Sequence, residues 1–225
     1  MQQNKKYDRG KKPLSFFAHQ CYNKNILINR ILKRGNCFMV LFINGCVREN
    51  SRTWELAQAV LESMPDTMEE IRLYPDGPEG LDAKKLQLRD DLLAAKNYDH
   101  PMFRFAKQFA DADTIVMAAP YWDLAFPAKI RAYLEEITVS GITFRYGANG
   151  IPQGLCKAKK LIYVTTSGGP LFQNFGFEYI KSLAQLFYGI PDVSLLKAEG
   201  LDVWGNDPDK ILEEAKRSIP EILNG

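Results

Sequence analysis

Residues 113–130 read DTIVMAAPYWDLAFPAKI, which joins a strand, an unusual loop and the start of a helix. The apolar run from Asp113 to Ala118 is typical of a buried β-strand. The loop after it carries proline, tyrosine, tryptophan and aspartate, where a simple turn would carry glycine, asparagine or serine. Two large aromatic rings at the carboxyl end of a strand pack against something flat. That surface is either the protein's own core or a ligand.

The same alternation of strand and helix continues in both directions along the chain. Short apolar runs predict strands at 38–43, 70–74, 114–118, 161–165 and 193–197. Amphipathic segments predict helices at 51–64, 84–95, from Pro101 onward, 127–137, 177–188 and 208–223. Strands separated by helices imply right-handed crossovers and a parallel sheet covered on both faces. We therefore predict an α/β fold, a flavodoxin-like doubly wound five-stranded parallel sheet with helices on both faces.

The composition indicates one folded domain in a reducing, cytoplasmic environment. At 225 residues and 46% hydrophobic content, the chain can bury a full core. No apolar run approaches the roughly 18 residues of a membrane span, so no membrane insertion is expected. The four cysteines form no C-x-x-C pair and no metal-like spacing with the two histidines, which argues against a disulfide framework or a zinc site.

The charge is distributed unevenly along the chain. Residues 1–38 hold nine Lys or Arg against one acidic residue, which leaves a net charge of −6 for residues 39–225. A basic arm can attract nucleic acid or membrane, but we assign it no such partner, and its apolar patch at 25–32 is too interrupted for a signal peptide. We expect residues 1–38 to be a poorly ordered extension, with Met39 a candidate for the true start, and residues 39–225 to form the domain.

The first loop of functional interest runs from residue 44 to residue 53 and reads NGCVRENSRT. Ligands of doubly wound sheets bind at the carboxyl ends of the strands, so the strand-to-helix loops form one rim. Ser51 or Asn50 can cap the following helix, and the free N–H groups of its first turn, with Arg52 and Thr53, can hold a phosphate. An ordinary helix N-cap would explain the same residues. The loop lacks the glycine patterns of dinucleotide and P-loop sites.

Two more loops emerge on the same rim. In the loop quoted first, Tyr121 and Trp122 offer aromatic surface, although such rings also pack under helices. In the loop that begins TTSGGP at Thr165, Gly168 and Gly169 let the backbone come close to a ligand, although they also suit a tight turn. A phosphate site, an aromatic surface and close backbone donors together suit a flat ring with a phosphate tail.

Five segments carry a family resemblance, in this order: NSRT at 50–53, AAPYWDLAFPAKIRAYLE at 118–135, GITFRY at 141–146, KKLIYVTTSGG at 159–169 and AEGLD at 198–202. With them the sequence resembles the FMN-dependent NAD(P)H oxidoreductases of flavodoxin-like fold, the quinone reductase and azoreductase group. The resemblance implies FMN as cofactor and NADH or NADPH as electron donor. It also implies ping-pong transfer of hydride to a quinone, azo compound or similar flat acceptor, by a homodimer.

The resemblance also implies roles for individual residues. It implies that the FMN phosphate is bound by Ser51, Arg52 and Thr53. The pyrimidine edge of the flavin would be hydrogen-bonded by Ser167, Gly168 and Gly169. The flavin ring is lined by Pro120, Tyr121, Trp122, Asp123 and Leu124. Phe144 and Tyr146 would wall the substrate site across the dimer interface. No side chain is assigned as a catalytic acid or base, because the flavin carries the chemistry, and no metal is expected.

The chain departs from the family at several positions. Asp123 stands where many azoreductases have asparagine, and an ionised side chain near flavin N5 would oppose an anionic reduced flavin. The third loop lacks the arginine of many azoreductases, and no histidine follows it, so the electron acceptor stays open.

Two other classes of protein share this topology. A flavodoxin-type FMN electron carrier would bind the same cofactor without NAD(P)H turnover, and Phe144, Tyr146 and the helical segment 81–110 favour the enzyme. A response-regulator receiver binds metal and needs adjacent acidic residues after the first strand. This chain reads Asn44-Gly-Cys46 at that position, so we reject the receiver.

Overall fold

A computed structural model describes residues 38–64, 67–75 and 77–225 of the chain. The N-terminal extension expected over residues 1–38 lies outside the described residues, except for Phe38. The folded unit that starts at Phe38 holds all the helices and strands described here.

The strands of this unit are β1 (Met39–Asn44), β2 (Thr67–Arg72), β3 (Thr114–Ala118), β4 (Phe144–Tyr146), β5 (Pro152–Gly154), β6 (Lys160–Thr166) and β7 (Asp192–Ala198). The helices are α2 (Arg52–Glu62), α3 (Ala83–Ala94), the 3-10 turn η1 (Pro101–Phe103), α4 (Arg104–Asp111), α5 (Ala128–Ile137), α6 (Phe175–Leu183), its π-helical continuation η2 (Ala184–Tyr188), α7 (Pro208–Arg217) and α8 (Ile219–Asn224). Several helices are capped at their N-terminus by a side-chain oxygen that accepts a hydrogen bond from a backbone N–H of the first turn. The capping residues are Ser51, Asp82, Asn174 and Asp207.

The main sheet has five parallel strands in the order β2-β1-β3-β6-β7. β1 and β3 are buried along almost their whole length, as expected for central strands covered on both faces. The chain leaves β1 for β2 on one side and returns to β3 on the other, which makes the β1–β3 boundary the switch point of the sheet. This topology confirms the predicted flavodoxin-like fold.

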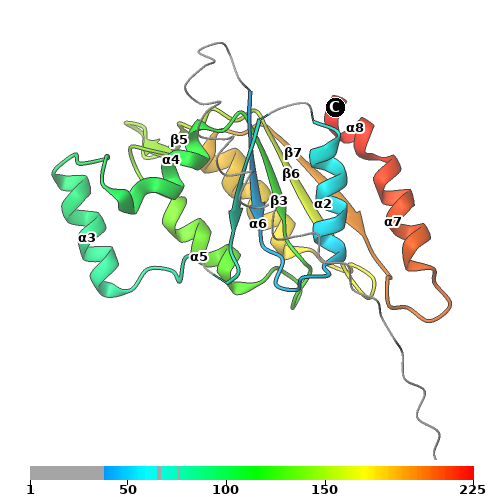
Figure 1. The fold of residues 1–225 in the computed structure, drawn as a ribbon. Coiled ribbons are helices and arrows are strands. Elements are labelled where there is room, and N and C mark those ends of the chain that lie inside the picture. Colours follow the sequence, from blue (N-terminus) through cyan, green and yellow to red (C-terminus); the bar gives the residue numbers. More distant parts are fainter. Residues whose placement is uncertain (1–37, 65–66, 76) are drawn as a thin grey trace, which may run out of the picture. The chain divides into compact units, whose positions relative to one another are not determined.

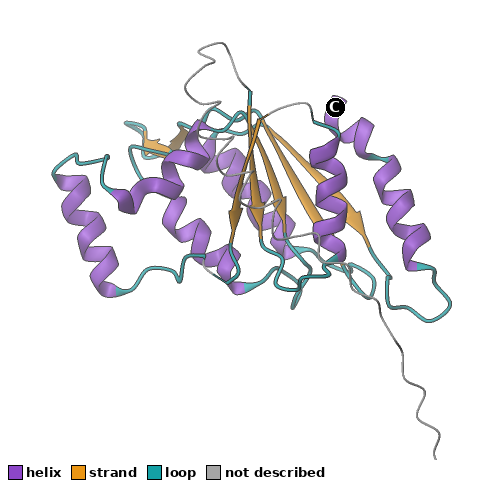
Figure 2. Cartoon of the chain, viewed as in Figure 1, coloured by secondary structure: helices purple, strands orange, loops and turns teal. Residues whose placement is uncertain are grey.

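Helices cover both faces of the sheet (Figures 1 and 2). On one face, α2, α7 and α8 pack on alternate strand residues such as Val40, Phe42 and Val116. On the other face, α4, α5 and α6 pack on the intervening residues such as Leu41, Ile115 and Met117. α3 lies farther out and has no buried residue (Figure 1). The alternation of faces follows from the two-residue period of a strand.

The structure differs from the sequence predictions in three places. The hairpin of β4 and β5 was not predicted, because strands of three residues are too short to show a two-residue period. β2 begins at Thr67 rather than Glu70, and of its residues only Ile71 is buried because it is an edge strand. The predicted last helix is two helices that meet at Ser218, where Pro220 cannot supply a helical N–H. No helix in the described ranges is long and apolar enough to cross a membrane.

Candidate functional site

The carboxyl ends of the parallel strands carry four loops on one edge of the sheet, which we call the rim. The rim consists of residues 45–51, 119–127, 167–174 and 199–207, which follow β1, β3, β6 and β7. The first two loops approach each other closely, since Gly45 N donates to Ala118 O at 2.8 Å. A Cβ at Gly45 would lie 2.8 Å from that same oxygen, so only glycine fits. The structure therefore brings the three predicted loops together, and adds a fourth.

The first rim loop ends in the N-terminus of α2. Ser51 Oγ accepts from Trp54 N at 3.3 Å, while the N–H groups of Arg52 and Thr53 have no partner among the described residues. A hollow of about 230 Å³ lies against this helix end, lined by Glu49, Asn50, Ser51, Arg52, Trp54 and Glu55. Two free N–H groups and the helix dipole suit an anion there.

The side chains of Arg52 and Thr53 are already engaged. Thr53 is 1% exposed, and its Oγ1 lies 2.7 Å from Thr166 Oγ1 on β6. Arg52 donates from Nη1 to Leu201 O at 3.2 Å and from Nη2 to Asp202 Oδ1 at 2.9 Å. Of the three residues predicted to bind phosphate, Ser51 offers its hydroxyl, and the other two offer backbone N–H groups.

Cys46 belongs to the same loop. Burial raises the pKa of Cys46 to about 11, and a hydrogen bond with the Ser51 side chain offsets part of that rise. The thiol is therefore neutral at physiological pH, and it adds no negative charge to a phosphate site.

The second rim loop folds into a tight two-residue hairpin. Ala125 N donates to Trp122 O at 2.8 Å, and the two residues between them have positive φ, 51° for Asp123 and 66° for Leu124. Positive φ at both central positions is the geometry of a type I′ turn, which normally carries Asn or Gly. A left-handed residue with a side chain costs about 1–2 kcal/mol. Such strain is typical of ligand-binding loops.

This hairpin presents both side chains and backbone donors to solvent. Trp122 is 41% and Leu124 is 47% exposed, and neither belongs to a core cluster. The N–H groups of Asp123 and Leu124 have no partner within the described part of the chain. The Asp123 side chain is exposed, and Pro120 is half-buried at the start of the loop. The rings quoted at the outset are thus not core.

The second and third rim loops are tied to each other. Tyr121 OH donates to Gln173 O at 2.8 Å, and Phe175 N donates to Leu124 O at 3.0 Å. Tyr121 is therefore a half-buried link between loops, and Trp122 is the ring that stays available.

In the third rim loop, the carbonyls of Ser167, Gly168 and Gly169 accept the N–H groups of Leu201, Asp202 and Gly200, at 3.2, 2.8 and 3.0 Å. The Ser167 hydroxyl is buried and donates to Gly169 O. The N–H groups of both glycines have no partner among the residues described. A Cβ at Gly169 would meet nothing within 4 Å, so this backbone is open to a ligand.

Phe144 and Tyr146 lie away from the rim of their own chain. They belong to the β4–β5 hairpin, and the hairpin packs on η2 near the amino ends of the strands, whereas the rim is at the carboxyl ends (Figure 1). Phe144 is buried at 5.1 Å from the Phe187 ring, and Tyr146 is 60% exposed. Within one chain, these rings do not wall the site of the rim.

Sequence reasoning missed several residues of the rim. Phe172 lies on the third loop and is 87% exposed. Phe175 is the first residue of α6, is 51% exposed and donates its N–H to Leu124 O of the second rim loop. The fourth loop entered only as the segment AEGLD, yet it holds the third loop in place through Asp202 and through Glu199, whose Oε2 accepts from Leu171 N at 2.7 Å. A hydrogen bond from Lys197 lowers the pKa of the Glu199 carboxyl. Gly200 and Gly205 have positive φ in this loop, and these two glycines are the sequence signal from which the loop could have been predicted.

The donor set of the rim fits FMN. A phosphate dianion matches the free N–H groups at the start of α2. A flat ring whose pyrimidine edge carries carbonyl oxygens matches the N–H groups of Gly168 and Gly169 and those of Asp123 and Leu124, none of which has a partner among the described residues. Trp122 supplies exposed aromatic surface beside them.

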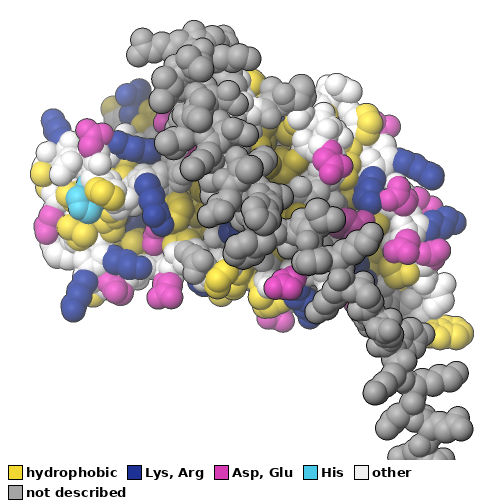
Figure 3. Space-filling model, in the orientation of Figure 1, with side chains coloured by type: hydrophobic (Ala, Val, Ile, Leu, Met, Phe, Trp, Pro, Cys, Tyr) yellow, Lys and Arg dark blue, Asp and Glu magenta, His cyan; other side chains and the backbone are white. Residues whose placement is uncertain are grey.

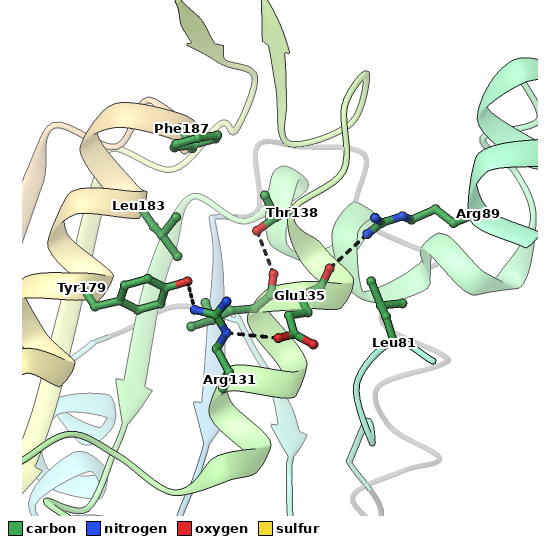
Figure 4. A pocket seen from close by; sticks show the side chains of 9 residues that line it. Leu81, Arg89, Arg131, Glu135, Thr138, Tyr179, Leu183 and Phe187 are labelled. Carbon is green, nitrogen blue, oxygen red and sulfur yellow. Dashed lines mark hydrogen bonds and ion pairs between the residues drawn. The ribbon is translucent and has the colours of Figure 1, made fainter. Parts of the chain in front are cut away.

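A second hollow, of about 290 Å³, lies between α3, α5 and α6 and contains none of the predicted site residues (Figure 4). Arg131 donates there to Tyr179 OH and to Glu135, and Arg89 donates to Glu135 O at 3.4 Å. The rest of its wall is mostly apolar: Leu81, Leu134, Thr138, Leu183 and Phe187.

Comparison with known proteins matches residues 39–223 to the family model described as flavodoxin-like fold. The chain is 33% identical over 185 residues to the FMN-dependent NADH:quinone oxidoreductase of Coprothermobacter proteolyticus, covering 77% of this chain and 91% of that one. It is 36% identical over 190 residues to the enzyme of that name from Clostridium beijerinckii, covering 78% and 93%.

Solved structures agree on the fold. An azoreductase from Bacillus anthracis superposes with a TM-score of 0.71 at 24% identity, covering 83% of this chain and 99% of that one. An FMN-dependent NADH-azoreductase from the same species, in complex with FMN, gives 0.70 at 23% identity, covering 83% and 98%. The sheet order and the sequence matches lead to one conclusion: the chain belongs to the flavodoxin-like family of FMN-dependent NADH:quinone oxidoreductases.

Proposed function

We propose that the protein binds FMN on the rim and transfers hydride from NADH or NADPH to a quinone, azo compound or similar flat acceptor. The observation that carries this proposal lies on one edge of the sheet, where three pairs of backbone N–H groups have no partner among the described residues. The pairs lie at the start of α2, in the second rim loop and in the third. Bound FMN would supply the redox chemistry, accepting a hydride from the nicotinamide and passing it to the acceptor. The names of the related proteins support NADH as the donor.

The phosphate would be held by the first turn of α2. The N–H groups of Arg52 and Thr53 and the Ser51 hydroxyl donate to it, and the helix dipole favours its charge. The Thr53 hydroxyl anchors this turn to β6 through its hydrogen bond with the Thr166 hydroxyl, and it would not contact the phosphate itself. Glu49 and Glu55 line the same hollow, and their negative charge would oppose a phosphate, so the backbone N–H groups and the helix dipole would have to outweigh that repulsion.

The ring would lie between the second and third rim loops. Their N–H groups orient its polar edge, and Trp122 and Leu124 cover part of its surface and exclude water. The tie between Tyr121 and Gln173 and the turn from Trp122 to Ala125 fix this geometry before a ligand arrives. Fixed donors lower the cost of binding and of charge development.

Donor and acceptor would use the same open surface in turn, which is a ping-pong scheme. Phe172 and Phe175 extend that surface with exposed aromatic rings. Flat substrates such as a nicotinamide or a quinone stack on rings of this kind. No side chain of the described rim is assigned a proton-transfer role.

We further propose a homodimer in which Phe144 and Tyr146 reach the rim of the partner subunit. Two observations support this. The two rings lie near the amino ends of the strands, away from the rim of their own chain, and Phe144 packs on Phe187, which lines the largely apolar hollow of Figure 4. A second copy seated on that hollow would cover its wall. Tyr146→Ala should raise KM for the acceptor and leave the flavin content unchanged. Sedimentation that shows only monomers would contradict the dimer.

The cytoplasmic location expected from the cysteine usage also stays a prediction. Figure 3 shows acidic and basic side chains interspersed on the described part of this face, and the expectation of no nucleic-acid partner likewise stays a prediction.

Steady-state kinetics test the proposed function. With FMN bound, varied NADH at several fixed benzoquinone concentrations should give parallel double-reciprocal lines, the pattern of a ping-pong reaction. An FMN-binding protein with no NADH oxidation at any acceptor concentration would favour the electron-carrier alternative. Intersecting lines would reject the shared surface.

A further inference from the structure

We infer that the side chains of Arg52 and Asp202 form a clasp that positions the Gly168–Gly169 backbone for the flavin, and that the Arg52 guanidinium therefore acts on this loop and does not bind the phosphate. The inference rests on the proposed function, because it assigns two residues roles toward the FMN site. It departs from the role that the family resemblance implies for Arg52.

The first step concerns where the guanidinium points. Arg52 is the first residue of α2, and both of its hydrogen bonds end on the fourth rim loop, at Leu201 O and at Asp202 Oδ1. The two acceptors are 3.2 and 2.9 Å from Nη1 and Nη2. A guanidinium held by two acceptors in a fork is fixed in orientation, and it lies along the fourth loop.

The second step concerns what Asp202 holds. Its backbone N donates to Gly168 O at 2.8 Å, and the neighbouring Leu201 and Gly200 bond to Ser167 and Gly169 in the same way. These bonds occupy three consecutive carbonyls of the third loop. The N–H groups of Gly168 and Gly169 have no partner in the described part of the chain, so they form the donor pair available to a ligand.

The third step concerns Gly168 itself. A Cβ at this position would collide with Asp202 Oδ2, whereas a Cβ at Gly169 would meet open space. Gly168 is thus needed to admit the carboxylate of Asp202, and Gly169 to admit the ligand. The side chain that accepts from Arg52 is the one that packs on the glycine loop.

The pair contributes little to the stability of the fold. The side chains of Arg52 and Asp202 are 35% and 66% exposed, and ion pairs with this exposure are worth little in solution. Loss of the clasp should therefore act on the position of the third loop, and the chain should still fold.

Comparison of FMN with riboflavin tests the inference, because the two ligands share the ring and only FMN has the phosphate. Asp202→Asn and Arg52→Gln should each weaken both ligands by the same factor, about tenfold, as expected when a shared ring contact is displaced. The double variant should lose no more than either single variant, since the residues act through one contact. The absorption band of bound riboflavin should shift in each.

Two controls accompany these variants. Glu213→Gln removes an exposed ion pair on α7, where Glu213 lies 2.8 Å from Lys216, and should change neither affinity nor spectrum. Gly168→Ala forces Asp202 aside and should reproduce the Asp202→Asn result. The melting temperature of each flavin-free variant establishes that it is folded.

Two outcomes would overturn the inference. If Arg52→Gln weakens FMN binding and leaves riboflavin binding unchanged, the Arg52 guanidinium binds the phosphate. If Asp202→Asn leaves both affinities and the spectrum unchanged, the clasp does not position the loop. A wild-type protein that binds neither FMN nor riboflavin would instead reject the proposed function, and with it this inference.

Discussion

Replacing Trp122 by alanine separates a ligand-binding role of the aromatic loop from a packing role. Trp122 is 41% exposed and lies outside both core clusters, so its truncation should change the stability of the flavin-free protein by no more than about 0.5 kcal/mol, as at other surface sites. Phe109, which is 0% exposed in the core, is the matched control, and Phe109→Ala should cost about 3–5 kcal/mol.

The loss should instead be seen in flavin binding. An aromatic contact is worth about 0.5–1.5 kcal/mol beyond the area that it buries, so Kd for FMN should rise roughly tenfold or more in Trp122→Ala. Trp122→Phe keeps a ring and should recover much of the affinity. Urea unfolding of the flavin-free protein and quenching of FMN fluorescence give both quantities. A destabilisation above about 3 kcal/mol with unchanged Kd and turnover would refute the reasoning.

Four further predictions follow from the rim and the chain's start. Ser51→Ala should weaken FMN about tenfold or more and leave riboflavin nearly unchanged, because a hydrogen bond to a charged group is worth roughly 1.5–3 kcal/mol; equal losses would mean that Ser51 does not meet phosphate. Leu124→Gly should stabilise the flavin-free protein by up to about 1 kcal/mol in urea unfolding, since it relieves a left-handed residue at some cost in chain entropy; destabilisation would mean that the turn is unstrained. Alkylation of Cys46, followed by peptide mass spectrometry, should be slow at pH 7 and rise roughly tenfold per pH unit toward its pKa of about 11, and FMN should slow it further; a fast reaction at pH 7 would show an accessible thiolate. Removal of residues 1–38 should leave flavin content and turnover unchanged, because both the sheet and the family match begin at Met39; an insoluble product would contradict this.

The strands and helices of the sheet could be predicted from the sequence because each is long enough to show its period. β3 was predicted over its observed span, Thr114–Ala118, since a central strand is apolar on both faces. The β4–β5 hairpin gave no such signal, because each strand has three residues. The family resemblance included this segment, GITFRY at 141–146, but did not predict that it forms a strand.

The position of the predicted loops on one rim could be inferred from the sequence, but the direction of their side chains could not. Loop patterns placed Ser51, Trp122 and Gly169 on one rim, as the structure shows. Nothing in the local sequence relates Arg52 to Asp202, because their pairing depends on β7 lying beside β6 and on a loop 150 residues away. The same holds for Thr53, whose hydroxyl is used by Thr166 across the helix–sheet interface.

The absorbance spectrum of the purified protein, recorded after incubation with FMN and again after anaerobic addition of NADH, tests the central claim most directly. The account predicts a bound flavin spectrum that survives gel filtration, loses its visible bands with NADH and regains them when benzoquinone is added. A protein that leaves the column without flavin, or whose bound flavin spectrum NADH does not change, would contradict it.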